Sequence, residues 1–161
     1  MPRRSVIRDE KAVSPVIATI IIVAVAIVMS IAVAYWVLGL AGTFTRYEKL
    51  EIVTMYADAL NDNWSITAKL RNTGSAPATV NLILLNGKPI SALNTTGNIL
   101  VRVNDTQKNV EANPVTIDPG DIAVFVIQIK KTTPGFASGV SVEVTFHTAA
   151  GSDYPKVVVL P

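Results

Sequence analysis

The hydrophobic pattern divides the chain at about residue 50 into two stretches of different character. From Ala12 to Thr45, no Asp, Glu, Lys or Arg interrupts a run dominated by Ile, Val and Ala. As an α-helix, its centre over residues 16–41 would be roughly 39 Å long, which exceeds the ~30 Å hydrocarbon thickness of a bilayer. The run is apolar all round, so it predicts a helix that must be surrounded by lipid or by other helices.

The sequence marks the start of this helix more clearly than its end. Ser14 is suited to cap the first turn, and Pro15 fits the first helical position, where its missing N–H costs nothing. The sequence allows the helix to end between about Leu40 and Leu50; we expect it to continue to about Tyr47 and a strand to begin at Leu50. The predicted divisions are a leader at residues 1–12, a hydrophobic helix at 13–49 and an extracellular domain at 50–161.

Beyond Leu50 the pattern becomes that of short strands. Apolar and polar residues alternate over residues 65–71 and again over 140–147, which is typical of strands with one buried face. Asn86-Gly87 is a strong hairpin signal. Further strand-like segments, separated by Gly, Pro, Asn and Asp, are residues 50–57, 78–85, 99–103, 122–129 and 157–160.

Strands at this spacing favour an antiparallel, immunoglobulin-like β-sandwich, so the predicted fold class is α+β with one long helix at the N-terminus. Residues 122–129 are nearly all apolar, so we expect them to form a central strand covered on both faces. We expect residues 91–98 and 104–114 to be loops or exposed edges.

Basic residues lie before the apolar run, and an aromatic pair, Tyr35-Trp36, lies near its far end. This distribution favours an N-terminus held in the cytoplasm and an aromatic anchor at the outer interface. Apart from the leader, acidic and basic residues balance, so a nucleic-acid role, which requires clustered cations, has little support. The cations of the leader are Arg3, Arg4, Arg8 and Lys11.

A charged leader that meets an apolar run at Lys11-Ala12 is open to three interpretations. A secretory signal has an apolar region of about 7–15 residues, roughly half the length of this one, followed by a small-residue cleavage site. No clear A-x-A site lies before Tyr35, so a secretory signal fits poorly. A plain membrane anchor fits by length. The third interpretation comes from the residues at this junction. Lys11-Ala12 followed by Val-Ser-Pro-Val-Ile-Ala-Thr-Ile resembles the class III signal peptide of archaeal type IV pilins.

That resemblance is specific over about residues 8–50 and implies cleavage after Ala12 by a prepilin peptidase, which leaves Val13 as the first residue. It also implies a subunit that waits in the cytoplasmic membrane and then polymerises into an extracellular adhesion-type pilus, with an assembly ATPase and a membrane platform protein as partners. Bacterial pilins carry a glutamate at the fifth mature position, where this chain has Ile17. Subunit register must therefore come from packing.

Small residues let helix backbones approach closely where lipid provides no hydrophobic drive for association. The helix intersperses such residues with larger aliphatic ones. The residues expected to pack in the filament core are Ala18, Ile20, Val23, Ala24, Ile27, Ile31, Ala34 and Leu38.

Candidate catalytic chemistry is sparse in this sequence. The absence of cysteine excludes disulfides, a thiol nucleophile and thiolate metal sites. The one histidine, His147, falls on the polar face of an alternating strand, where a solvent-facing role is expected. No metal motif, phosphate loop or nucleophile elbow is present, so we predict a non-enzyme without cofactors.

Three N-x-[ST] sequons lie beyond the membrane segment, and each is an acceptor for N-glycosylation. They begin at Asn63, Asn94 and Asn104. The setting of Asn94 is the most loop-like of the three, so the sequence favours Asn94 first.

Two alternatives to the pilus subunit remain open. An archaellin, the subunit of the rotating archaeal filament, shares the plan of helix and sandwich, although Val13-Ser14-Pro15-Val16-Ile17 looks more like a pilin opening. A single-span membrane protein with an extracellular binding domain would also have this pattern. Such an anchor has no need for Lys11-Ala12 at the edge of its span.

Overall fold

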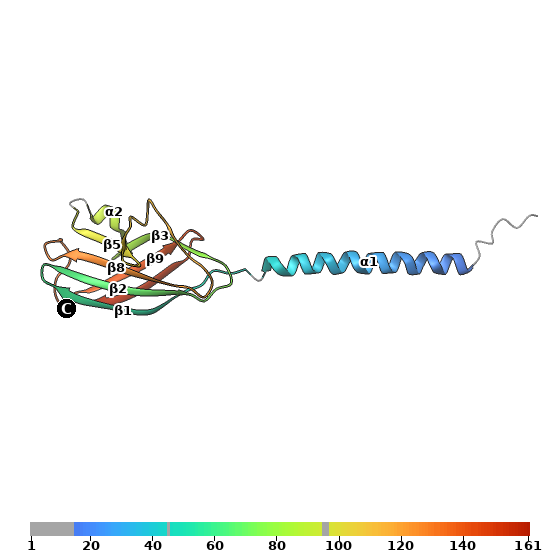
Figure 1. Ribbon diagram of the computed structural model, residues 1–161, viewed down its shortest axis with the longest axis horizontal. Helices are drawn as coiled ribbons and strands as arrows, with labels where there is room; N and C mark the ends of the chain where they lie inside the picture. Colours follow the sequence, from blue (N-terminus) through green and yellow to red (C-terminus); the bar gives the residue numbers. More distant parts are fainter. Residues whose placement is uncertain (1–14, 45, 95–96) are drawn as a thin grey trace, which may run out of the picture. The chain divides into compact units, whose positions relative to one another are not determined.

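The computed structural model describes residues 15–44, 46–94 and 97–161, and the chain divides into two compact units between Thr45 and Arg46. Figure 1 labels the helix of the first unit and several strands of the second. Each unit has its own architecture.

The first unit consists of a single helix, α1, over Pro15–Phe44. Its first described residue is Pro15, which the sequence marked as suited to the first helical position. The expected continuation to about Tyr47 is wrong, because α1 ends at Phe44 and the carbonyl groups of Tyr47 and Lys49 accept hydrogen bonds from a loop of the second unit instead. Strand β1 begins at Leu50, as predicted.

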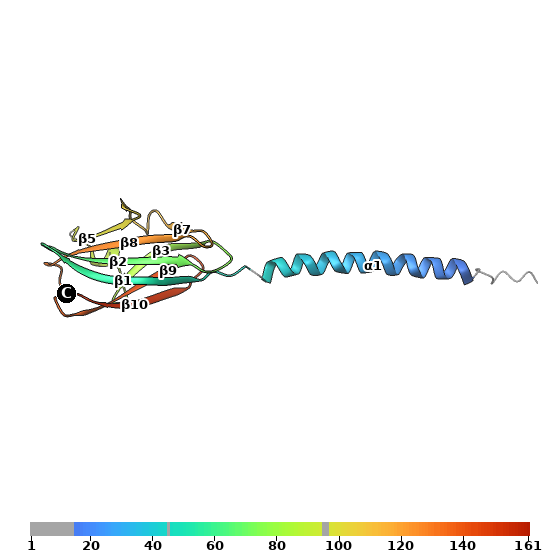
Figure 2. The same cartoon turned by 60° about the horizontal axis from the view of Figure 1, so that its bottom comes forward.

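The second unit is a pair of antiparallel sheets, which confirms the α+β class and is consistent with a β-sandwich (Figure 2). The first sheet has the order β1-β2-β8-β5-β6 and comprises Leu50–Leu60, Asn63–Asn72, Ile122–Lys130, Ile99–Val103 and Thr106–Gln107. The second has the order β10-β9-β3-β4, with β7 also paired to β3, and comprises Asp153–Val159, Ser141–Thr148, Ala78–Leu85, Lys88–Pro89 and Val115–Ile117. A short helix, α2, covers Ile90–Leu93.

Side chains from the inner faces of both sheets form one hydrophobic core. At its centre, Phe125 of β8 meets Phe146 of β9 edge to face, with ring centroids 5.2 Å apart, a favoured aromatic geometry. All the buried residues of this core come from the second unit. The sandwich therefore buries its own apolar side chains without any contribution from α1.

The turn chemistry predicted at Asn86-Gly87 is confirmed. Both residues have positive φ, 49° and 75°, and they join β3 to β4 as a two-residue hairpin loop. Positive φ at both central positions defines the turn whose twist matches that of the paired strands.

One expectation about β8 is wrong. The strand lies between β2 and β5 in the middle of its sheet, as predicted, but only its inner face is buried. Its outward side chains are half-buried or exposed, and Ile122 is 49% exposed. A continuous apolar run thus marks a central strand here, although nothing within the described residues covers its outer face.

Candidate functional site

The surface of α1 is the most unusual feature of the described chain. Its side chains are aliphatic on every side, and none of those that the structure describes is buried. Residues such as Ile22 and Leu38 are 67% and 71% exposed. The span from Pro15 to Leu40 has the length and composition to cross a membrane. So large an apolar surface requires a lipid or protein environment.

Two hydroxyl side chains within α1 are already satisfied by the helix itself. The Thr19 hydroxyl donates to the Val16 carbonyl at 2.8 Å, and the Ser30 hydroxyl donates to the Ala26 carbonyl at 2.7 Å. Such bonds back to the preceding turn leave no hydroxyl proton unpaired in a medium without water. Thr19 and Ser30 are therefore compatible with hydrocarbon or with a packed helix neighbour.

The residues predicted to pack in a filament core lie on α1 and are not buried by the chain itself. Helical spacing of three and four residues places all of them except Ala18 on one side of the helix. Two shallow depressions lie beside small side chains on the helix surface. They are lined by Thr19, Ile20, Val23, Ala24 and Ile27 and, further along, by Met29, Ser30, Val33, Ala34, Val37 and Leu38. A neighbouring helix can approach closely at such places. Ala18 lies on the opposite side.

The predicted processing residues Lys11, Ala12 and Val13 lie outside the described residues, so the cleavage site stays a prediction from the sequence.

The segment Arg46–Lys49, which we call the linker, is fixed to the sandwich by backbone hydrogen bonds. The Tyr47 carbonyl accepts from the last two N–H groups of the loop 73–76, at 3.0 and 3.1 Å. The Lys49 carbonyl accepts from the first two, at 2.8 and 3.2 Å, and the Tyr47 N–H donates to the Ser75 hydroxyl at 3.1 Å. The chain is thus held against the sandwich from Tyr47 onward.

Gly74 makes this close approach possible. A Cβ atom at position 74 would lie 2.5 Å from the Tyr47 carbonyl oxygen and 2.6 Å from the Lys49 nitrogen. Both are backbone atoms, which cannot move aside as the end of a side chain can. Only glycine allows the linker and the loop to meet at this distance.

Asn72 is fully buried, and its side chain fixes the loop 73–76 by hydrogen bonds. Its side-chain amide donates to the carbonyl groups of Ala76 and Ile117, both at 2.8 Å, and its carbonyl oxygen accepts from the Gly74 N–H at 2.9 Å. In the sequence, Asn72 is one of the residues between the strand-like segments 65–71 and 78–85. The long-range partner Ile117 is what makes this asparagine specific, and no local pattern reveals it.

His147 has a partner that the sequence did not suggest. Its Nδ1 lies 2.6 Å from a carboxylate oxygen of Asp153, its cross-strand neighbour on β10. The side chains are 33% and 61% exposed, so the pair resembles an ordinary surface contact between strands. Within the described part of the chain, no group of three or more His, Cys, Asp or Glu residues could hold a metal ion.

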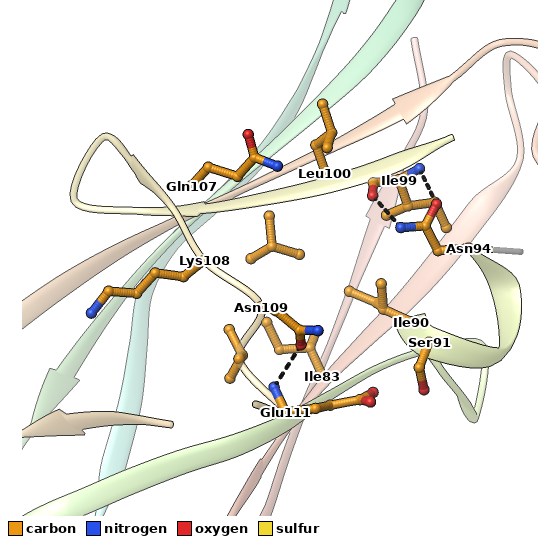
Figure 3. Close-up of a pocket in the computed structure, with 12 residues that line it drawn as sticks. Ile83, Ile90, Ser91, Asn94, Ile99, Leu100, Gln107, Lys108, Asn109 and Glu111 are labelled. Atoms are coloured by element: carbon orange, nitrogen blue, oxygen red, sulfur yellow. Dashed lines mark hydrogen bonds between the residues drawn. The ribbon is translucent and has the colours of Figure 1, made fainter. Parts of the chain in front are cut away.

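A cavity of about 260 Å³ lies beside α2 and β5, and Figure 3 shows its lining. Ile83, Ile90 and Ile99 contribute apolar wall, and Asn109 and Glu111 come from the segment after β6. Drug-sized ligands occupy pockets of roughly 300–1,000 Å³. The volume of this cavity is below that range.

The three sequons differ in their surroundings. Asn94 is half-buried, and its side chain bridges the backbone of Ile99, donating at 2.6 Å and accepting at 2.8 Å (Figure 3). Asn63 opens β2, and the Ser65 hydroxyl of its sequon belongs to a residue only 6% exposed. Asn104 is exposed at the turn between β5 and β6, where its side-chain oxygen Oδ1 accepts from the Val124 N–H at 2.9 Å.

No protein-family model matches the chain, and no curated protein does. Among solved structures, the archaellum periplasmic stator protein FlaG from Sulfolobus acidocaldarius is 19% identical over 69% of this chain and 99% of its own, with a TM-score of 0.46. The apo PmoF2 PCuAC domain is 8% identical over 71% and 94%, with a TM-score of 0.49. The Iho670 flagellar-like filament is 16% identical over 91% and 98%, with a TM-score of 0.36.

Likenesses this low assign neither a family nor an activity to the chain. The features that carry functional meaning are its own: a long apolar helix that fits a pilin-like protein, and a sandwich whose core is complete without that helix.

Proposed function

We propose that the chain is the major structural subunit of an archaeal type IV adhesion-type pilus, without enzymatic activity. Its helix forms the filament core and its sandwich forms the outer surface. The observation that carries the proposal is α1, a helix of 30 residues that is apolar all round and buries none of its described side chains. Such a surface is stable first in lipid and then among identical helices.

The energetics of the transfer indicate which partners are needed. Lipid tails and neighbouring helices are equally apolar, so moving α1 from one to the other changes the hydrophobic free energy little. Assembly must gain from close packing and from contacts between sandwiches, and extraction from the bilayer needs an outside source of work. A prepilin peptidase, an assembly ATPase and a membrane platform protein are the partners that the proposal entails.

The linker supports a filament role for a mechanical reason. Any pull on the sandwich reaches α1 through residues 46–49, and the backbone bonds to the loop 73–76 hold that segment in place. A sandwich that meets shear at the cell surface needs such an attachment.

An archaellin remains the second candidate, because it would use the same helix and sandwich. A single-span anchor with a binding domain is the third. The anchor differs in having no use for proteolytic processing at Lys11-Ala12.

Processing provides the experiment. Lys11→Ala should block cleavage, so that precursor accumulates in the membrane and filaments disappear from the cell surface in electron micrographs. Lys49→Ala, which removes a cation beyond the membrane segment, is the matched control and should leave processing intact. Normal filaments from the Lys11→Ala variant would contradict the proposal.

A further inference from the structure

The outer face of the first sheet carries an excess of positive charge. Strand pairing places the outward residues of β1, β2, β8 and β5 side by side in rows. Four cations and two carboxylates stand on these rows, which we call the cationic face. The cations are Lys69, Arg71, Arg102 and Lys130, and the carboxylates are Glu51 and Asp58.

The cationic face also has an apolar centre. The outward side chains along β8 include Ile122, which is 49% exposed, and the half-buried Val124 and Val126. Leu100 on β5 is 36% exposed, and Tyr56 on β1 is 51% exposed. Contiguous apolar side chains rimmed by charge mark an interaction surface on a folded domain.

The outer face of the second sheet has the opposite charge. Its outward rows contain Glu143 on β9 and Asp153 on β10, whose carboxylate lies 2.6 Å from Nδ1 of His147 on the same face, and no Lys or Arg side chain stands on the outward rows of β3, β9 and β10. We call this surface the acidic face. Val157 and Val159 give it an apolar part, since they are 57% and 56% exposed.

We propose that the cationic face of one sandwich docks onto the acidic face of a neighbouring copy. The proposal rests on the filament function proposed above and names the contact between its outer domains. The two faces belong to different sheets of one sandwich, so each copy can offer a cationic face to one neighbour and an acidic face to the next. Such a head-to-tail contact does not close on itself in a pair and extends along a helical filament.

The size of the faces sets the strength of this contact. The acidic face is formed mainly by three strands of seven or eight residues. At ~4.8 Å between strands and ~3.3 Å per residue, it measures on the order of 370 Å². Standard-size interfaces between proteins bury about 800 Å² per partner. The contact is therefore too small to hold two free molecules together and acts between copies that their helices already bring close.

Engineered cysteines test the contact directly, because the native chain has no cysteine. Val124 stands on the cationic face, and Thr145 stands on the acidic face; both are half-buried. In sheared filaments of the full chain carrying V124C and T145C together, mild oxidation should give a ladder of dimers, trimers and larger species. Each single variant should remain monomeric on the same gel. A dimer from V124C alone would mean that cationic faces pair with each other, which would overturn the proposal.

Charge exchange gives a second test in the same background. Lys69→Glu should lower the yield of cross-linked species about two- to fivefold, the range expected for one exposed ion pair. Adding Glu143→Lys should restore the yield. No recovery in the exchanged variant would contradict the pairing of these faces.

Filament counts by electron microscopy separate the two proposals. If filaments are abundant and the double-cysteine variant gives no ladder, the docking of the two faces is wrong while the filament function stands. If wild-type cells assemble no filaments from this chain, the function itself fails.

Discussion

Two residues fix the attachment of the linker to the sandwich, and each does so by a different physical means. Gly74 leaves room for the backbone of Tyr47 and Lys49, because any Cβ would overlap their atoms. The Asn72 side chain donates to the carbonyl groups of Ala76 and Ile117 and accepts from the Gly74 N–H. Unpaired polar groups of this kind cost about 1–3 kcal/mol each.

Gly74→Ala should therefore lower the free energy of unfolding of the sandwich by roughly 1–3 kcal/mol, the usual cost of overpacking. The measurement is thermal or urea unfolding of the purified protein in detergent. Gly39→Ala is the matched control, because a Cβ at position 39 meets nothing within 4 Å. Equal stability of the two variants would show that the linker does not need this close approach.

Asn72→Asp should also destabilise the sandwich, by roughly 2 kcal/mol or more, because the carboxylate keeps the shape and loses the donor to Ala76 and Ile117. Asn109→Asp, which lies at an exposed position, is the control. Both variants are compared by urea unfolding at neutral pH. An unchanged midpoint for Asn72→Asp would contradict the assigned hydrogen bonds.

The surroundings of the sequons change the order in which we expect glycosylation. Asn94, the first choice from the sequence, already uses its amide to hold Ile99, whereas Asn104 is exposed at a turn. We predict that intact-mass analysis of native material finds a glycan at Asn104 before Asn94. Thr106→Ala should remove that glycan while keeping the Asn104 bond to Val124. Unmodified asparagine at all three positions would remove the prediction.

Among the elements, those with a local sequence signature were predictable and those that depend on tertiary contacts were not. The start of β1 and the hairpin at Asn86-Gly87 both follow from local chemistry. The end of α1 does not, since it depends on hydrogen bonds between residues 47–49 and a loop about 25 residues further on. Periodicity also gave the core-facing residues of β2 and β9.

The candidate site divides in the same way. The apolar run predicts α1 and includes the residues that line the depressions on its surface. The sequence alone did not show that Thr19 and Ser30 bond back to their own helix. It also could not show that Asp153 stands opposite His147, because strand register decides which residues of two strands meet.

At the level of α1, Ile27→Asp should prevent assembly. A carboxylate at the centre of a packed apolar helix bundle lacks a partner and costs several kcal/mol. Ile27→Leu keeps the volume and the apolar character and should assemble normally. Filaments of normal abundance from the aspartate variant, counted in electron micrographs, would contradict the placement of α1 in a filament core.

On the scale of the whole molecule, the two units have different requirements. The sandwich buries its own core and is suited to face water, whereas α1 is stable only in lipid or among other helices. A subunit that is first anchored and then polymerised meets both requirements in turn. The proposed docking of cationic and acidic faces would add a contact between sandwiches to the contact between helices.

The central claim is that the chain is processed at its N-terminal junction and assembled outside the cell. The most direct measurement is the N-terminal mass of the protein recovered from sheared cell surfaces, together with its sedimentation. We expect a chain that begins at Val13 and sediments as a species of high mass. A chain that begins at Met1 and stays with the membrane would contradict it and would favour an anchored binding domain.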